Sequence, residues 1–148
     1  MSKGVAITGM GIITAIGNNV AEKYQSLIDG KKGISRVSKI KTNHVNDIMV
    51  GEIAFTNAEL EQQLNLSSDN NYSRTALLGA IAAKQALENA NITDINAYKT
   101  GLVSSTSVGG MDMTERYYYD YLENKAAQKY IEGHHAGDST QKIAEQLG

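Results

Sequence analysis

Glycines near the start of the chain form the pattern that comes closest to a phosphate-binding motif. A short apolar run, Val5-Ala6-Ile7, is followed by Gly9-x-Gly11-x-x-Thr14. A dinucleotide-binding turn, Gly-x-Gly-x-x-Gly/Ala, needs a helix that begins inside the glycines and aims its N-terminus at a pyrophosphate. Here the sixth position is threonine, and the helical pattern begins only after Asn18-Asn19. We therefore interpret Gly9 and Gly11 as residues that adopt positive φ or let another backbone approach closely.

Few side chains could act as nucleophiles or metal ligands. The 148 residues include no cysteine, which excludes disulfides, thiolate metal sites and a cysteine nucleophile within this sequence. Ser105 and Ser107 lack the preceding glycine of a Gly-x-Ser-x-Gly nucleophile elbow. His134 and His135 are adjacent and point apart, and His44 is isolated. We predict no metal site, no cofactor and no catalytic residue among these positions.

The segments that position these residues predict an α/β arrangement. Val5-Ala6-Ile7 has the continuous apolar character of a strand buried on both faces, in the middle of a mostly parallel sheet. Further strands are predicted over 48–55 and 100–106, and helices over 20–29, 58–64, 73–89, 111–131 (continuous or broken) and 138–147. The middle of the helix over 73–89 is apolar or small all the way round, so it must be covered on more than one side.

Composition excludes several classes of protein. A hydrophobic content of 41% and a charged content of 20% are those of an ordinary soluble domain. A net charge of −2 implies no general attraction to nucleic acid. The sequence shows no secretory signal and no apolar run long enough to span a membrane, which favours the cytoplasm.

Two surface features leave alternatives open. The stretch 31–41 holds five basic residues and no acid, so it is either a solvated loop or a contact surface for an acidic partner. Residues 117–121 include four of the eight tyrosines, which cannot all face one side of one helix. Some of these rings meet another chain or lie under a loop, or the cluster is a simple surface patch.

Two segments resemble β-ketoacyl-acyl-carrier-protein synthases, the condensing enzymes of fatty-acid and polyketide synthesis. The first is VAITGMGIITAIGNN followed by a helix and Gly30-Lys31-Lys32-Gly33-Ile34-Ser35, and the second is Thr100–Asp112. The resemblance covers essentially the whole chain, which corresponds to less than half of a synthase. It implies an α/β, thiolase-like fold, here an incomplete N-terminal half with a mixed sheet and covering helices, in one domain, 1–148, without an internal boundary.

The resemblance also implies the activity. Synthases of this family catalyse decarboxylative condensation of an acyl thioester with malonyl-acyl-carrier-protein, and we expect their nucleophilic cysteine to lie beyond the end of this chain. Their two histidines belong to later motifs, so that role does not transfer to His134 or His135. The turn Ser107-Val108-Gly109-Gly110 corresponds to one beside the acyl-chain pocket and near the dimer partner. Glycines that merely turn the chain are the alternative.

Expected partners follow from the same resemblance. They are an acyl carrier protein, and the remainder of the synthase or a homologous chain that completes the sheet in a dimer. Related synthases often carry basic residues ahead of the helix at 73–89, where the carrier docks, but here Asp69 is the only charge within 67–71. The alternatives to an enzyme are a catalytically silent partner subunit, a dimerisation or binding module and, third, a nucleotide-binding domain.

Overall fold

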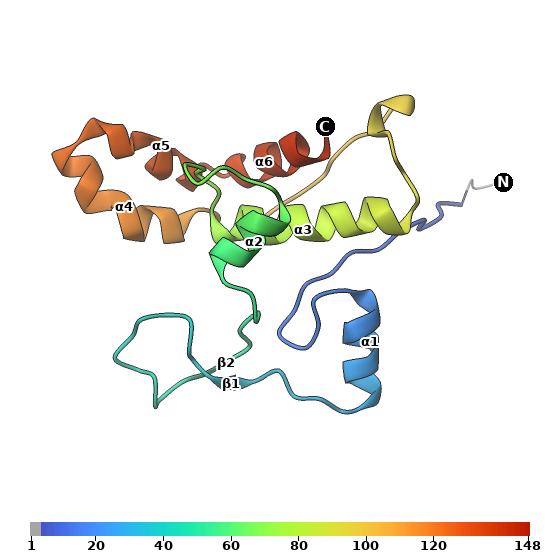
Figure 1. Ribbon diagram of the computed structural model, residues 1–148, viewed down its shortest axis with the longest axis horizontal. Helices are drawn as coiled ribbons and strands as arrows, with labels where there is room; N and C mark the ends of the chain where they lie inside the picture. Colours follow the sequence, from blue (N-terminus) through green and yellow to red (C-terminus); the bar gives the residue numbers. More distant parts are fainter. Residues whose placement is uncertain (1–3) are drawn as a thin grey trace.

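The computed structural model describes residues 4–148, whose secondary structure is mainly helical. In Figure 1 the helices α2 to α6 form one layer, and α1 lies with a small two-stranded sheet in a separate lobe beside it. The elements are α1 (Val20–Ile28), β1 (Ser35–Arg36), β2 (Met49–Val50), α2 (Asn57–Gln63), α3 (Arg74–Asn89), η1 (Ile95–Ala97), α4 (Met111–Glu123), η2 (Lys125–Ala127), α5 (Gln128–Ile131), η3 (Glu132–His134) and α6 (Asp138–Leu147).

Local sequence signals place the helix boundaries. The side chains of Asn19, Thr56 and Ser73 accept hydrogen bonds from the first turns of α1, α2 and α3, as N-caps do. Thr56 and Glu59 form a reciprocal capping box. Gly30 follows the last turn of α1 with a φ of 63°, the left-handed conformation in which glycine commonly ends a helix.

Helix α3 is the centre of the hydrophobic core. Its apolar side packs against α2 and α6, and the core cluster consists of Leu60, Leu64, Leu77, Ala80, Ile81 and Ile143. A Cβ on Gly79 would lie 2.5 Å from Cδ1 of Ile143, so glycine at this position lets α6 approach α3 closely. The prediction that this helix is covered on more than one side is confirmed.

The opening glycines provide a further cover for α3. A Cβ on Gly9 or Gly11 would overlap backbone carbonyl oxygens of α3, so the chain passes directly against the helix. Two side chains of α3 hold it there: Asn89 Oδ1 accepts from the N–H of Met10 (3.0 Å), and Gln85 Oε1 accepts from the N–H of Ile12 (3.1 Å). Of the two predicted roles for these glycines, the structure therefore shows close backbone approach. The next helix begins at Val20 rather than at Gly11.

The predicted mixed sheet is not formed within the described residues. Val5 and Ile7, expected in a buried central strand, are 97% and 85% exposed, and their segment is extended without a strand partner. The predicted strand over 100–106 is irregular, and Val103 is 98% exposed. These predictions were wrong for this structure because a strand needs a neighbour for its backbone groups, and residues 4–148 place none beside either segment.

The sheet that does form is a short antiparallel pair. Met49–Val50, a small part of the strand predicted over 48–55, pairs with β1 in the register Ser35↔Val50 and Arg36↔Met49. The chain is thus of mixed α and β structure, with a much smaller sheet than expected. Among residues 4–148, no helix has the combined length and apolar character needed to cross a bilayer.

Candidate functional site

The turn predicted to line an acyl pocket leads directly into α4. Gly110 is the N-cap residue of α4, with a φ of 71° in the left-handed region, and it is buried. A Cβ at this position would overlap the carbonyl oxygen of Gly133 in η3. Ser107 and Val108 lie on the outside, and Val108 is 56% exposed. Gly110 therefore packs the turn onto η3, and the side chains of Ser107 and Val108 remain accessible.

Helix α6 and η3 hold the surroundings of this turn. Thr140 Oγ1 of α6 donates to the carbonyl of Ser104 (3.4 Å), which joins the segment before the turn to α6. Thr114 Oγ1 and His134 Nδ1 share a hydrogen bond of 2.9 Å, which joins α4 to η3. A depression of about 420 Å³ lies on this side of the molecule, and it is lined by Tyr121, Gln128, Ile131, Glu132, His134 and His135.

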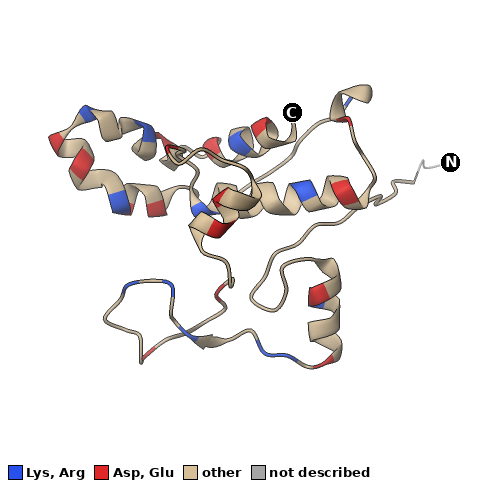
Figure 2. Ribbon diagram, viewed as in Figure 1, with Lys and Arg blue, Asp and Glu red and all other residues tan. Residues whose placement is uncertain are grey.

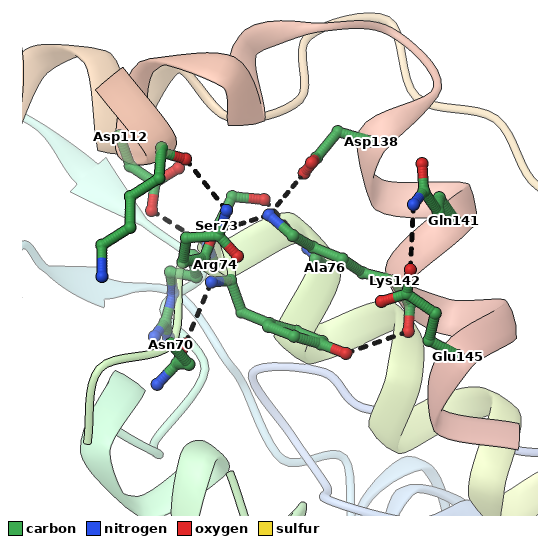
Figure 3. A network of polar contacts seen from close by, with 12 residues as sticks. Asn70, Ser73, Arg74, Ala76, Asp112, Asp138, Gln141, Lys142 and Glu145 are labelled. Carbon is green, nitrogen blue, oxygen red and sulfur yellow. Dashed lines mark hydrogen bonds and ion pairs between the residues drawn. The ribbon is translucent and has the colours of Figure 1, made fainter. Parts of the chain in front are cut away.

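A buried lysine organises the start of α6. The Lys142 side chain is only 7% exposed, and its ammonium donates to Asp138 Oδ2 (2.8 Å) and to the carbonyl of Asn71 (2.6 Å). Figure 3 shows the side chains of Lys142 and Asp138 pointing toward one another between α6 and the start of α3. The Tyr72 hydroxyl donates to the carbonyl of Lys142 (3.2 Å), and burial raises the pKa of that hydroxyl. This network ties α6 to the segment that precedes α3.

Sequence reasoning missed this network, although part of its signal was visible. Asp138 and Lys142 are four residues apart in a predicted helix, the spacing at which side chains meet. Burial of the pair was not visible, because it depends on the segment before α3 lying across α6.

Arg74 and Asp112 join α3 to α2 and α4. The backbone N–H of Arg74 donates to Asp112 Oδ2 (2.9 Å), so a side chain from the first turn of α4 satisfies an amide at the start of α3. The Arg74 guanidinium donates to Asn57 Oδ1 (2.6 Å) and to the carbonyl of Phe55 (3.0 Å). These contacts give Arg74 a structural role, because they join three helices.

The polar loop before α3 carries a neutralised carboxylate. Asp69 Oδ1 accepts from the Lys129 ammonium and from the Tyr130 hydroxyl (3.1 Å). These hydrogen bonds, that of Lys129 first, lower the pKa of Asp69. The ammonium of Lys129, which lies beside this loop, is thus already paired with the Asp69 carboxylate.

The tyrosines of residues 117–121 are partly packed inside the chain and partly exposed on its surface. Tyr117 stacks on Tyr130, with ring centroids 4.1 Å apart, and lies half-buried between α4 and α5. Tyr118 and Tyr119 contact each other edge to face and are exposed. Met113, Tyr117 and Tyr121, which are four residues apart, share the less exposed face of α4. The helix predicted over 111–131 is broken, since α4 ends at Glu123.

The histidines, for which we predicted no metal site, lie in different parts of the structure. His134 is bonded to Thr114, whereas His44 Nδ1 lies 3.2 Å from Asp47 Oδ2 in the other lobe. Within the part of the chain that the structure describes, no three His, Asp or Glu side chains form a cluster that could hold a metal ion. The geometry of residues 4–148 shows packing contacts in this region, and it brings no catalytic pair together.

Comparison with known proteins decides the family. Residues 2–144 match the sequence model described as "Beta-ketoacyl synthase, N-terminal domain". The chain belongs to this family. The 3-oxoacyl-[acyl-carrier-protein] synthase 2 of Staphylococcus aureus (strain N315) is 28% identical over 116 residues, which are 77% of this chain. The synthase of the same name from Synechocystis sp. (strain ATCC 27184 / PCC 6803 / Kazusa) is 29% identical over 115 residues, or 76% of this chain.

These matches cover a minor part of each relative. The aligned segment is 28% of the Staphylococcus protein and 27% of the Synechocystis protein. The aligned part of this β-ketoacyl synthase chain thus covers less than a third of the length of the curated relatives that it matches. The resemblance first noted in the opening segment and in Thr100–Asp112 is confirmed at the level of the family.

Proposed function

We propose that this chain is the N-terminal segment of a 3-oxoacyl-acyl-carrier-protein synthase with the thiolase-like fold. The synthase is an acyltransferase that condenses an acyl thioester with malonyl-acyl-carrier-protein, with loss of carbon dioxide, in fatty-acid or polyketide synthesis. The family match over residues 2–144, together with the names of the curated relatives, carries this proposal. Metal-free and cofactor-free chemistry, and a cytoplasmic location, stay predictions.

The nucleophile of this reaction comes from sequence outside the 148 residues. None of these residues is cysteine, so they cannot supply the thiolate that forms the acyl-enzyme. The role of the present segment is therefore to build the scaffold and one wall of the acyl site. The packing of Gly9 and Gly11 on α3 supports the scaffold role. It holds the extended opening segment against a helix, where neighbouring strands could hydrogen-bond to its backbone.

Ser107, Val108, Gly109 and Gly110 form the acyl-site wall in this proposal. Gly110 and Gly109 hold the turn against η3 and α6, and Val108 is the large apolar side chain that the turn leaves exposed. An acyl chain is apolar, so an exposed valine on a rigid turn is suited to contact it. The polypeptide or partner chain that completes the synthase encloses the other side of the pocket.

One experiment separates an active synthase from a catalytically silent partner subunit. The complete synthase polypeptide is incubated with an acyl thioester, and its intact mass is measured before and after malonyl-acyl-carrier-protein is added. A condensing enzyme gains the mass of the acyl group on one cysteine, loses it when the malonyl substrate arrives, and releases a 3-oxoacyl product. A protein that never becomes acylated and forms no product contradicts the proposal, and the silent partner then replaces it.

A further inference from the structure

Lys142 is the only charged residue that is buried among residues 4–148. Its ammonium bonds to Asp138 and to the carbonyl of Asn71, and the ring centroid of Tyr72 lies 5.4 Å from Nζ. Figure 2 shows acidic and basic positions close together along α6. Taking two charges out of water costs free energy, and an apolar pair of similar volume often stabilises a fold as well or better. Stability alone therefore does not account for an ion pair at this place.

The ion pair lies beside Gly133, which contacts the turn that we call the acyl turn, residues 107–110. A Cβ on Gly133 would lie 3.6 Å from Asp138 Oδ2 and 3.8 Å from Lys142 Nζ. The carbonyl oxygen of the same glycine lies directly against Gly110, where it would overlap an added Cβ. Gly133 is buried, and close-packed interiors transmit small displacements. A shift of the ion pair therefore moves η3 and, through it, the acyl turn.

The first turn of α6 also contacts the acyl turn directly. Ser139 is buried, and its Oγ would lie 3.8 Å from a Cβ on Gly109. Thr140 Oγ1 donates to the carbonyl of Ser104, which lies shortly before the acyl turn. Asp138 immediately precedes these two residues, so one turn of helix carries both the ion pair and the contacts to the acyl turn.

The ion pair supplies the restraint that a capping side chain supplies in other helices. The N-cap residue of α6 is Gly137, which has no side chain to bond the first amides. Lys142 bonds to Asp138 one helical turn before it, and the same ammonium bonds to the carbonyl of Asn71. Asn71 belongs to the segment that leads into α3, the centre of the core. The start of α6 is thus held against the most buried part of the chain.

We propose that Lys142 and Asp138 are positioning residues that hold the acyl turn in place and thereby determine which acyl chains the synthase accepts. This inference rests on the proposed function, in which the acyl turn is one wall of the acyl site. The ion pair acts through Gly133 and Ser139 and does not itself touch the substrate. Charged hydrogen bonds favour one geometry, whereas an apolar pair packs in several ways, so the charges fix a single position of the turn.

Three variants of the complete synthase polypeptide separate positioning from stability. Lys142→Met/Asp138→Leu makes the pair apolar and removes its directed bonds. Asp138→Asn keeps the shape and an acceptor oxygen for Lys142 but leaves the buried ammonium without its anion, so it should melt at a lower temperature than the double variant. Leu60→Ala is the matched control, because it leaves a cavity in the core at α2, away from the acyl turn.

The first readout is kcat/KM for a series of acyl pantetheine thioesters of increasing chain length. In the double variant, the ratio of kcat/KM between the longest and the shortest chain should change about tenfold, because a wall of the acyl site has moved. The change should lie mainly in KM, since the ion pair touches no reacting atom. Asp138→Asn and Leu60→Ala should leave the ratio within about twofold, although both lower the melting temperature.

The second readout needs no substrate. The amides of Met113 and Thr114 donate to the carbonyl of Gly110, so their hydrogen exchange reports on the acyl turn. Their exchange in Lys142→Met/Asp138→Leu should be about tenfold faster than in Leu60→Ala. If the double variant does not fold, Lys142→Met/Asp138→Asn replaces it in both measurements.

The outcomes separate this inference from the proposed function. A chain-length ratio that follows the melting temperature through all three variants gives the ion pair a purely structural role and overturns the inference. Equal exchange at Met113 and Thr114 in the double variant and in Leu60→Ala overturns it as well. Faster exchange with an unchanged chain-length ratio overturns the effect on acyl selectivity. An unmodified protein that forms no 3-oxoacyl product refutes the proposed function, whereas the exchange measurement still decides whether the ion pair holds the turn.

Discussion

Replacing Gly110 with alanine should destabilise the protein much more than the same change at Gly30. Both glycines have left-handed φ values, 71° and 63°. At Gly30 nothing lies within 4 Å of an added Cβ, whereas at Gly110 the Cβ would overlap the backbone of Gly133. The pair therefore separates the conformational cost of a left-handed alanine from the steric cost of the packed turn.

The two costs can be estimated separately. A left-handed alanine costs about 1–2 kcal/mol, and about 0.4–1 kcal/mol of this is offset because alanine restricts the unfolded chain. Gly30→Ala should thus lower the free energy of unfolding by about 1 kcal/mol. Gly110→Ala adds an overpacking cost of about 1–3 kcal/mol, because η3 must move away from α4. The total for Gly110→Ala is about 2–4 kcal/mol.

Circular dichroism at increasing temperature measures this difference. At roughly 2–4 °C per kcal/mol for a chain of this size, the melting temperature should fall by about 3 °C for Gly30→Ala and by about 9 °C for Gly110→Ala. Equal shifts for the two variants would refute the close contact between Gly110 and Gly133. A smaller shift for Gly110→Ala than for Gly30→Ala would also refute it.

Three further predictions concern the buried pair, the lobe and the acyl turn. Lys142→Met should lower the free energy of unfolding, measured with urea, by about 3 kcal/mol, because the Asp138 carboxylate is only 17% exposed and loses its cation. The double variant Lys142→Met/Asp138→Leu should recover part of that loss, because it removes the unpaired carboxylate as well. Hydrogen bonds from Ser38 and from the N–H of Lys39 lower the pKa of Glu52 from its ordinary value of 4.5. The Glu52 carboxylate therefore stabilises the fold above that pH, and this stabilisation is lost as the pH falls through the folded-state pKa. Ser38→Ala should raise the pKa of Glu52 in an NMR titration, and an unchanged pKa would contradict the contact. Val108→Trp should leave the melting temperature within about 2 °C, because Val108 is exposed, yet shorten the acyl chains that the complete synthase accepts; an unchanged chain-length profile would remove Val108 from the acyl site.

The helices of this chain could be predicted because their determinants are local. Asn19, Thr56 and Ser73 cap the helices that follow them, and Gly30 ends α1, all within one turn of the residues that they serve. The small residues of α3 likewise indicated close neighbours on several sides. Such signals need no knowledge of the rest of the chain.

The strands could not be predicted in the same way, because a strand depends on partners far away in sequence. Val5-Ala6-Ile7 and Val103 have strand-like composition, yet the described residues place no neighbouring strand beside them. The position of the candidate turn was correct, since Gly109 and Gly110 do precede a helix. The contact of Gly110 with Gly133 and the buried Lys142–Asp138 pair depend on tertiary packing, and the sequence offered only the four-residue spacing of the latter.

Amide hydrogen exchange at Val5, Ala6 and Ile7 tests most directly whether this chain is the N-terminal segment of a synthase. In the 148-residue chain these amides are exposed and should exchange rapidly. In the complete synthase polypeptide the same amides should exchange at least about a hundredfold more slowly, because neighbouring strands then bond to them. Rapid exchange in both proteins would contradict the account, since the opening segment would then have no sheet to join.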